Sequence, residues 1–302
     1  MAPYSYCSLE KSKRYVSGWE PERKEAVGEK HARSYLTLWI VDGKIKSVVE
    51  AAEDPRLFLL DGTLYAVVIK SVYSGAASVA TVPWLFALRQ ERQVQLHFEG
   101  MRDFERNWAP FTADGRFFFL YSVCPRVVLE CDFECRKSGL VKEVYPDHSE
   151  DDCRYDLRAT SALITVVLDP LIGPELLGVA HRTISVTGLK VDRLYLHTFF
   201  TLQPTPPFAI QRTSRFFRFE TFFASELDMV QFASGLHVED VAVQTNYKPA
   251  AKVQIDYGVA DCAGLTTSLS VKEVNALFDD DHSGDDQVDD GVDDGHPTSK
   301  RR

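Results

Sequence analysis

The stretch Glu53-Asp54-Pro55-Arg56-Leu57-Phe58-Leu59-Leu60-Asp61-Gly62-Thr63-Leu64-Tyr65-Ala66-Val67-Val68 decides the fold that we expect for this chain. Its centre, Asp61-Gly62, lies between two apolar runs and is typical of a two-residue β-hairpin turn, because both turn positions need positive φ. Pro55 disfavours helical backbone at Asp54, so we expect Asp54 to be extended. The stretch therefore predicts two strands joined by a tight turn, with a carboxylate and a guanidinium at the start of a buried strand. A plain ion pair at a loop end is the alternative interpretation of Asp54 and Arg56.

The same pattern recurs along the chain. Asp42-Gly43 separates two apolar runs between Ser34 and Val49, and Asp114-Gly115 precedes the aromatic run Phe117–Tyr121. The last two Asp-Gly turns are about fifty residues apart, which is a spacing typical of propeller blades. The repeat therefore favours blades built from consecutive hairpins.

Most of the remaining chain carries short apolar segments bounded by turn residues. We expect helix only at Val271–Phe278 and at Pro21–Val27, and we expect the polar segment Lys137–Tyr155 to be a loop. Many short strands with almost no helix predict an all-β barrel, sandwich or propeller, and the repeated hairpins favour the propeller. The further strands that we expect are Val82–Ala87, Gln93–Phe98, Val127–Cys131, Ser161–Leu168, Leu177–His181, Leu194–Phe200, Phe208–Ile210, Phe216–Phe223, Val230–Phe232, Val241–Thr245 and Val253–Gly258.

The chain divides into three segments by composition. Residues 1–31 mix Pro, Gly, Lys and Glu without periodicity and are expected to be irregular. Residues 32–278 carry the strand pattern and form the expected propeller domain. Residues 279–302 are a low-complexity acidic tail that we expect to be disordered.

The charge distribution argues against nucleic-acid binding. The tail holds nine aspartates and three basic residues, so it carries -6 of the formal net charge of -10 and leaves about -4 on the rest. A nearly balanced body with an acidic tail has no basic footprint for nucleic acid. No apolar run reaches the roughly 18 residues of a membrane helix, and the first residues lack a secretory apolar region, so we expect a cytoplasmic protein without a membrane span.

The cysteine pattern argues against a zinc site. The six cysteines include no Cys-x-x-Cys pair, and Cys131/Cys135 has no second pair behind it. We therefore expect free thiols in a reducing compartment and no bound metal.

Six fragments, taken in order, are similar to a known enzyme family. The set resembles the β-propeller β-mannoside phosphorylases of glycoside hydrolase family 130, and the related mannosyltransferase/phosphorylase-like proteins of eukaryotic microbes, over about Ser34–Ser270. The fragments are Glu53-Asp54-Pro55-Arg56-Leu57-Phe58, Arg106-Asn107-Trp108-Ala109-Pro110-Phe111, Tyr121-Ser122-Val123-Cys124-Pro125-Arg126-Val127-Val128-Leu129, Leu177-Gly178-Val179-Ala180-His181-Arg182, Tyr195-Leu196-His197 and Ile255-Asp256-Tyr257-Gly258-Val259-Ala260-Asp261.

The resemblance implies a five-bladed propeller and an inverting transfer of a mannosyl residue to or from phosphate or a sugar acceptor. It leaves open whether the first blade is complete, because Met1–Ala32 lacks the Asn-Pro blade opening that the family usually has. It implies a glycosyltransferase or glycoside phosphorylase whose partners are an oligosaccharide or sugar phosphate and inorganic phosphate, with no metal or organic cofactor. A phosphorylase needs one acid and a cationic pocket, since phosphate is itself the nucleophile.

The resemblance also implies a role for each site residue. Asp54 would be the catalytic general acid; Arg56, Asn107, Trp108 and Asp261 would bind substrate; and Arg158, His181, Arg182 and His197 would bind phosphate. Arg56 would in addition brace the turn, and Trp108 would stack on a sugar ring. Structural roles remain the alternative for four of these positions: a core tryptophan at Trp108, hydrogen-bonded core histidines at His181 and His197, and a turn residue at Asp261.

Two departures from the family pattern leave a second function open. The segment expected to be rich in glycine reads Arg158-Ala159-Thr160-Ser161-Ala162, and Arg126 stands where a histidine is common. Together with the missing blade opening, they keep open a catalytically degenerate propeller that binds a glycan or a partner protein.

Overall fold

The computed structural model describes most of the chain between residues 35 and 278. The described residues are 35–41, 44–50, 52–74, 77–87, 92–132, 134–146, 156–185, 193–220, 230–239, 252–259 and 263–278. The expected irregular segment 1–31, the acidic tail 279–302 and the expected helix Pro21–Val27 lie outside these ranges. The boundaries expected for the three segments therefore remain predictions.

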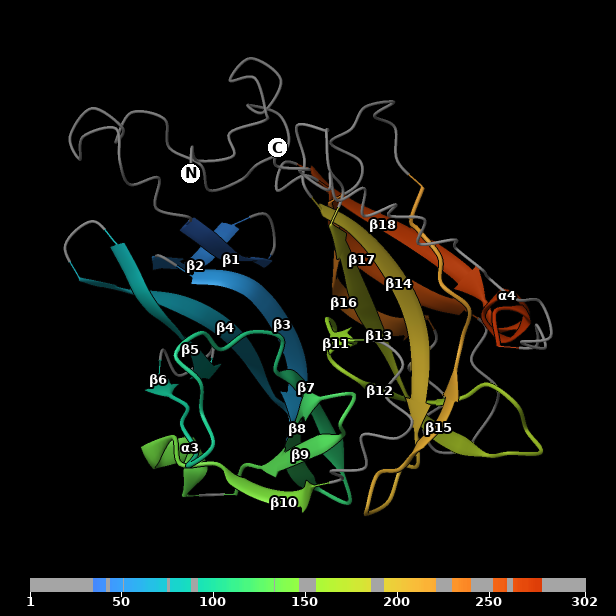
Figure 1. Ribbon diagram of the computed structural model, residues 1–302, viewed down its shortest axis with the longest axis horizontal. Coiled ribbons are helices and arrows are strands. Elements are labelled where there is room, and N and C mark those ends of the chain that lie inside the picture. The colour runs from blue at the N-terminus through green and yellow to red at the C-terminus, as the bar shows by residue number, and fades with distance from the viewer. Residues whose placement is uncertain are drawn as a thin grey trace, which may run out of the picture.

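The described residues form an all-β structure of consecutive antiparallel sheets, as the sequence predicts (Figure 1). A two-stranded sheet pairs β1 (Tyr35–Val41) with β2 (Lys44–Glu50). The next sheet has the order β3 (Ala52–Leu60), β4 (Thr63–Ser74), β5 (Ala77–Ala87), β6 (Arg92–Gln95). It is followed by β7 (Ala109–Ala113), β8 (Arg116–Ser122), β9 (Val127–Glu130) and β10 (Lys142–Pro146).

The remaining two sheets complete the arrangement. In one, β11 (Arg158–Ala159) and β12 (Ile164–Val167) both pair with β13 (Pro174–Ser185), which continues to β14 (Arg193–Leu202) and β15 (Ile210–Thr213). The other has the order β16 (Gln231–Glu239), β17 (Lys252–Val259), β18 (Ala263–Ser270). The short helices are α3 (Cys135–Ser138) and α4 (Val271–Ala276), and α4 confirms the helix expected there.

The sheets lie around a common centre in a propeller-like arrangement (Figure 1). Contacts join β3 to β7, β3 to β16, β11 to β8 and β12 to β16, so the first strand of each larger sheet lies nearest that centre. The described residues contain four sheets of three or more strands, and β1 and β2 form only a two-stranded sheet. The count of five blades is therefore corrected to four blades among the described residues.

The Asp-Gly turns have the backbone that the sequence predicts. Asp61 and Gly62 have φ of 49° and 67°, and Asp114 and Gly115 have φ of 49° and 69°. Positive φ at both central positions defines the type I′ turn, whose twist matches that of the flanking strands. These two turns fix the registers of β3 with β4 and of β7 with β8.

Among the described residues the core consists of three apolar clusters, one between each pair of larger sheets that follow one another along the chain. The strand β8 contributes to two of them, since Phe117 and Phe119 pack toward β3–β6 whereas Phe118 and Leu120 pack toward β11–β15. A strand buried on both faces explains why its sequence is a continuous apolar run rather than an alternating one. The sheets are thereby held face to face around the centre.

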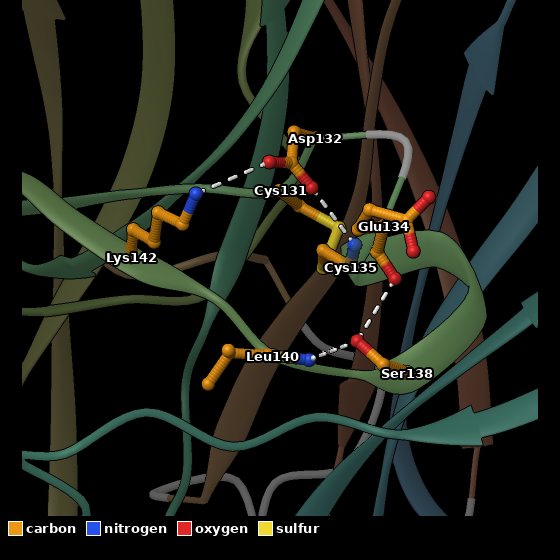
Figure 2. Close-up of a disulfide and its surroundings, with 7 residues drawn as sticks. All are labelled: Cys131, Asp132, Glu134, Cys135, Ser138, Leu140 and Lys142. Atoms are coloured by element: carbon orange, nitrogen blue, oxygen red, sulfur yellow. Dashed lines mark hydrogen bonds and ion pairs between the residues drawn. A yellow bond between two sulfur atoms is a disulfide. The ribbon is translucent and has the colours of Figure 1, made fainter.

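The segment expected to be a loop contains regular structure, and this corrects the prediction for Lys137–Tyr155. Helix α3 reaches Ser138 and strand β10 runs from Lys142 to Pro146. Cys131 and Cys135 form a disulfide beside α3, and Asp132 accepts a hydrogen bond from the Cys135 amide at 2.9 Å (Figure 2). Cys124 is disulfide-bonded as well, so the expectation of free thiols is wrong for all three.

No helix among the described residues has the length and apolar character needed to cross a membrane.

Candidate functional site

The first strands of the four larger sheets meet at one buried guanidinium group, that of Arg56. Its Nη1 donates to the backbone oxygen of Asp54 at 2.9 Å, Nε donates to the backbone oxygen of Thr160 at 2.5 Å, and Nη2 donates to Asn107 Oδ1 at 3.0 Å. The guanidinium carbon also lies 5.4 Å from the ring centre of Phe232 in β16. One side chain thus contacts residues that lie in, or within two residues of, the first strand of each larger sheet.

Burial explains both the cost and the rigidity of this arrangement. Arg56 has no exposed surface, and its desolvation lowers the pKa of the guanidinium to about 10, while the charge of Asp54 acts in the opposite direction. A buried cation is tolerated when its donors are all satisfied. Arg56 therefore remains charged at neutral pH, and it fixes the backbone on which the expected acid stands.

Asp54 lies on a bulge at the start of β3, where the pairing with β4 skips between Glu53 and Arg56. Its φ is 50°, in the left-handed region that few residues other than glycine adopt. The bulge leaves 24% of the Asp54 side chain exposed, and Arg106 Nη1 lies 4.0 Å from Asp54 Oδ2. Asp54 is thus a partly accessible carboxylate held in an unusual backbone conformation. Residues with strained backbone of this kind cluster at functional sites.

Three of the residues expected to bind phosphate form a row across neighbouring strands. Arg158 of β11 pairs directly with His181 of β13, and His181 pairs directly with His197 of β14. The rings of the two histidines are 6.4 Å apart between centres. Arg158 is half exposed and bonded to Asp156 at 2.8 Å, so it is the solvent-accessible end of the row.

Both histidines are buried and neutral at neutral pH. His181 is 3% exposed and His197 is 0% exposed. Burial lowers the pKa of both rings to about 3. The charges of Arg158 and Arg56 lower the pKa of His181 further; at His197 the neighbouring His181, which disfavours protonation of both rings at once, and the charge of Arg218 do the same, while the Gln231 backbone acts in the opposite direction. Nδ1 of His181 and both ring nitrogens of His197 are buried without a hydrogen-bond partner of good geometry among the described residues. Buried unpaired nitrogens of this kind invite an explanation in terms of function.

The structure does not bring every predicted residue to this row. Arg182 follows His181 in the same strand and so projects from the opposite face of the sheet. Trp108 is fully buried, donates from Nε1 to Glu105 at 2.9 Å, and packs in the core on Phe119. Trp108 therefore has no exposed face for a sugar, and its surroundings fit the alternative role of a core tryptophan. Asp261 lies outside the described residues.

Several residues of the site were missed by the sequence reasoning. Thr160 contributes only a backbone oxygen, so no side-chain pattern could reveal it. Phe232 and Tyr195 flank His181, with ring centres 6.0 Å and 4.7 Å away. Arg106 precedes Asn107 in one of the six fragments, and its positive charge is the sequence signal that could have identified it as a partner of Asp54.

The segment that departs from the family pattern is packed against β13. Thr160 Oγ1 donates to the backbone oxygen of Val179 at 3.1 Å, and Ser161 Oγ accepts from the Val179 amide at 3.2 Å. These side chains therefore satisfy backbone groups of β13 and leave the Thr160 carbonyl to Arg56. The other departure, Arg126, donates to the backbone oxygen of Pro207.

Chemically, the site offers one partly exposed carboxylate, two arginines near it, and a row of one arginine and two neutral imidazoles. No three His, Cys, Asp or Glu side chains gather as a metal site would require within the part of the chain that the structure describes. The site is thus equipped for proton transfer by a carboxyl group and for binding an oxyanion.

No protein-family model matches the chain, and no curated protein matches its sequence. The structure is similar to solved structures of mannosyltransferases and mannoside phosphorylases. These are members of the group that the sequence fragments resemble.

Three examples give the extent of this similarity. MPT-1, a GDP-Man-dependent mannosyltransferase from Leishmania mexicana, is 14% identical over 72% of this chain and 68% of its own, with a TM-score of 0.48. MPT-4, a mannose phosphorylase from the same organism in complex with phosphate ion, is 12% identical over 74% and 70% of the two chains, with a TM-score of 0.46. The β-1,2-mannobiose phosphorylase from Listeria innocua is 13% identical over 75% and 60%, with a TM-score of 0.45.

Proposed function

We propose that this chain is a carbohydrate-active enzyme that transfers a mannosyl residue to or from phosphate or a sugar acceptor, as a glycoside phosphorylase or glycosyltransferase. The observation that supports this proposal is the pair of hydrogen bonds that the Arg56 side chain donates to the backbone oxygens of Asp54 and Thr160. Thr160 stands two residues after Arg158, so this link holds the candidate acid near the start of the row Arg158, His181, His197.

The proposed reaction uses these groups in one displacement. In the phosphorolytic direction, a phosphate oxygen forms a bond to the anomeric carbon while the glycosidic carbon–oxygen bond breaks. The carboxyl group of Asp54 gives its proton to the leaving oxygen, and the attack inverts the anomeric centre. Arg158 attracts the phosphate, and the neutral imidazoles of His181 and His197 offer N–H donors for its oxygens.

Substitution of the acid tests this function. We expect Asp54→Asn to lower release of mannose 1-phosphate from an oligomannoside with phosphate by about 1,000-fold or more, because the amide cannot supply the proton. A second assay with GDP-mannose and a sugar acceptor separates transferase from phosphorylase. Asp114→Asn is the matched control. Asp114 also has left-handed backbone, with φ of 49°, but it lies in the turn that follows β7 and not in the candidate site. Full activity of Asp54→Asn would refute the role of Asp54.

A second candidate function is a glycan-binding or protein-binding propeller without catalysis. The nearly complete burial of His181 and His197 favours it, because a ligand would have to displace neighbouring side chains to reach both rings. Titration calorimetry separates the two functions: binding of mannose oligosaccharides without turnover, with phosphate and with GDP-mannose, supports the binder.

The compartment is part of this proposal. The sequence predicted the cytoplasm, but the Cys131–Cys135 disulfide is of a kind found in oxidising compartments. Alkylation of the chain isolated from its native compartment, followed by mass spectrometry, shows which thiols are oxidised there.

A further inference from the structure

A hollow of about 260 Å³ lies between the outer strands of the β3–β6 sheet and helix α3, away from Arg56 and the histidine row. The residues that line it are Thr63, Tyr65, Leu85, Ala87, Arg92, Val94, Arg136 and Lys137. None of them belongs to the candidate site described above. Its volume is close to the lower end of the range of small-molecule sites.

The charge on the walls of this hollow is positive. Arg92 of β6 and Arg136 and Lys137 of α3 bring three cations to it, and none of the described residues that line it is acidic. Two carboxylates lie near the cations of α3: Asp61 Oδ2 is 3.6 Å from Arg136 Nη1, and Glu134 Oε1 is 3.6 Å from Lys137 Nζ. Both carboxylate side chains are mostly exposed, so ion pairs with them are worth little.

Helix α3, which carries Arg136 and Lys137, is tied to its surroundings at both ends; Figure 2 shows the disulfide at its start. The Cys131–Cys135 disulfide and the bond from the Cys135 amide to Asp132 hold the start of the helix. At its end Gly139 has φ of 81° and lies so close to β6 that an added Cβ would be 1.7 Å from the backbone oxygen of Gln95. A site whose charged groups are fixed in advance loses less entropy when a ligand binds.

The remaining lining is mostly apolar. Tyr65, Leu85 and Ala87 are core residues of the β3–β6 sheet whose outermost surfaces form part of this wall, and Val94 adds an aliphatic side chain. Thr63 and Tyr65 each carry a hydroxyl group. The hollow therefore combines a cationic rim with an apolar wall, which suits a compact ligand that carries an oxyanion on a ring or short hydrocarbon.

We propose that this hollow is a second binding site, for a small phosphate or sulfate ester, and that it is independent of the Asp54 site. Arg92 and Lys137 bind the ester oxyanion from the two sides of the hollow, and the apolar wall contacts the group that the ester carries. Phosphate and sulfate esters share the chemistry that the rim recognises, and the experiment distinguishes them.

Calorimetric titration of the full-length chain with phenyl phosphate, phenyl sulfate and phenol tests this site. We expect at least one ester to bind, phenol to bind at least tenfold more weakly, and Arg92→Gln and Lys137→Gln each to weaken ester binding about tenfold. Arg116→Gln is the matched control: it makes the same change of charge at a half-exposed arginine that is paired with Glu130 on β8 and β9. Binding by Arg116→Gln should equal that of the unmodified chain.

A further variant separates this proposal from the function proposed above. Arg158→Gln alters the histidine row, so an ester that binds in the hollow should bind this variant with unchanged affinity. Loss of ester binding in Arg158→Gln with full retention in Arg92→Gln and Lys137→Gln would overturn the proposal, and so would absence of binding by both esters. The urea unfolding curve of each variant is compared with that of the unmodified chain to show that the variant is folded. Arg92 lies in β6 and Lys137 in α3, so a local change in one element does not affect the test made with the other variant.

Discussion

At the scale of single residues, the two buried histidines carry an expected dependence of stability on pH. In the folded chain both rings have a pKa of about 3, against 6.5 for an unperturbed histidine. The unfolded chain therefore binds protons at higher pH than the folded chain does. Stability is full above about pH 6.5 and falls as the pH decreases from there toward 3.

We expect the free energy of unfolding to fall by roughly 2 kcal/mol for each of the two rings between pH 7 and pH 5. Urea unfolding at a series of pH values measures this, and the window stays above the range where most carboxylates titrate. His181→Asn and His197→Asn should each flatten the profile by about half. His237→Asn is the control, because the side chain of His237 is half exposed. A profile that is flat from pH 7 to pH 5 would contradict the burial of the two rings.

At the scale of elements, the junction between α3 and β6 depends on a single glycine. Gly139 has φ of 81° and has no room for a side chain, whereas Gly62 has φ of 67° and open space around it. We expect Gly62→Ala to cost about 1 kcal/mol of unfolding free energy from backbone strain alone. Gly139→Ala should cost at least about 2 kcal/mol more, because it also forces α3 away from the Gln95 carbonyl.

Urea unfolding of the two variants makes this comparison directly, since the change in covalent structure is the same. Equal losses of stability in Gly62→Ala and Gly139→Ala would show that α3 does not pack closely on β6.

The elements that could be predicted from the sequence are those with local causes. The hairpins at Asp61-Gly62 and Asp114-Gly115 follow from two adjacent residues that accept positive φ, and α4 follows from a cap in which Ser270 and Glu273 bond each other's backbone amides. Helix α3 and strand β10 were missed because their support comes from distant residues. The His97 amide donates to the Gly139 carbonyl at 2.8 Å, and β10 exists by pairing with β9.

The candidate site divides in the same way. The sequence placed Asp54 near the start of the strand before the hairpin, but it predicted extended backbone there, whereas Asp54 lies on a bulge with φ of 50°. Three features depend on which strands become neighbours. They are the burial of Trp108, the hydrogen bond from Arg56 to the Thr160 carbonyl, and the row of Arg158, His181 and His197 across strands of one sheet. No pattern within one strand contains that information.

At the scale of the whole molecule, Arg56 couples the four larger sheets. It donates hydrogen bonds to Asp54 in β3, to Asn107 just before β7 and to Thr160 just after β11, and it lies over Phe232 in β16. Arg56→Lys keeps the charge but cannot reach three acceptors with a planar fork. We expect it to lower the free energy of unfolding by about 2–4 kcal/mol, because a buried charge then lacks part of its bonding.

Hydrogen exchange locates the effect of Arg56→Lys. The amides of all four sheets should exchange faster together, including that of Thr160, which donates to the Val179 carbonyl at 2.8 Å. Arg116→Lys, at an exposed ion pair with Glu130, should change stability by less than about 1 kcal/mol. Faster exchange confined to the β3–β6 sheet would show that Arg56 does not couple the sheets.

The bulge at Asp54 has a consequence for engineering. Its backbone oxygen is fixed by a side chain whose other partners stand 51 and 104 positions further along the chain. A loop graft that moved residues 53–62 into another scaffold would carry the carboxylate but not its anchors. Moving this site to another protein would require segments from several sheets at once, so the site can be transferred only together with the four larger sheets.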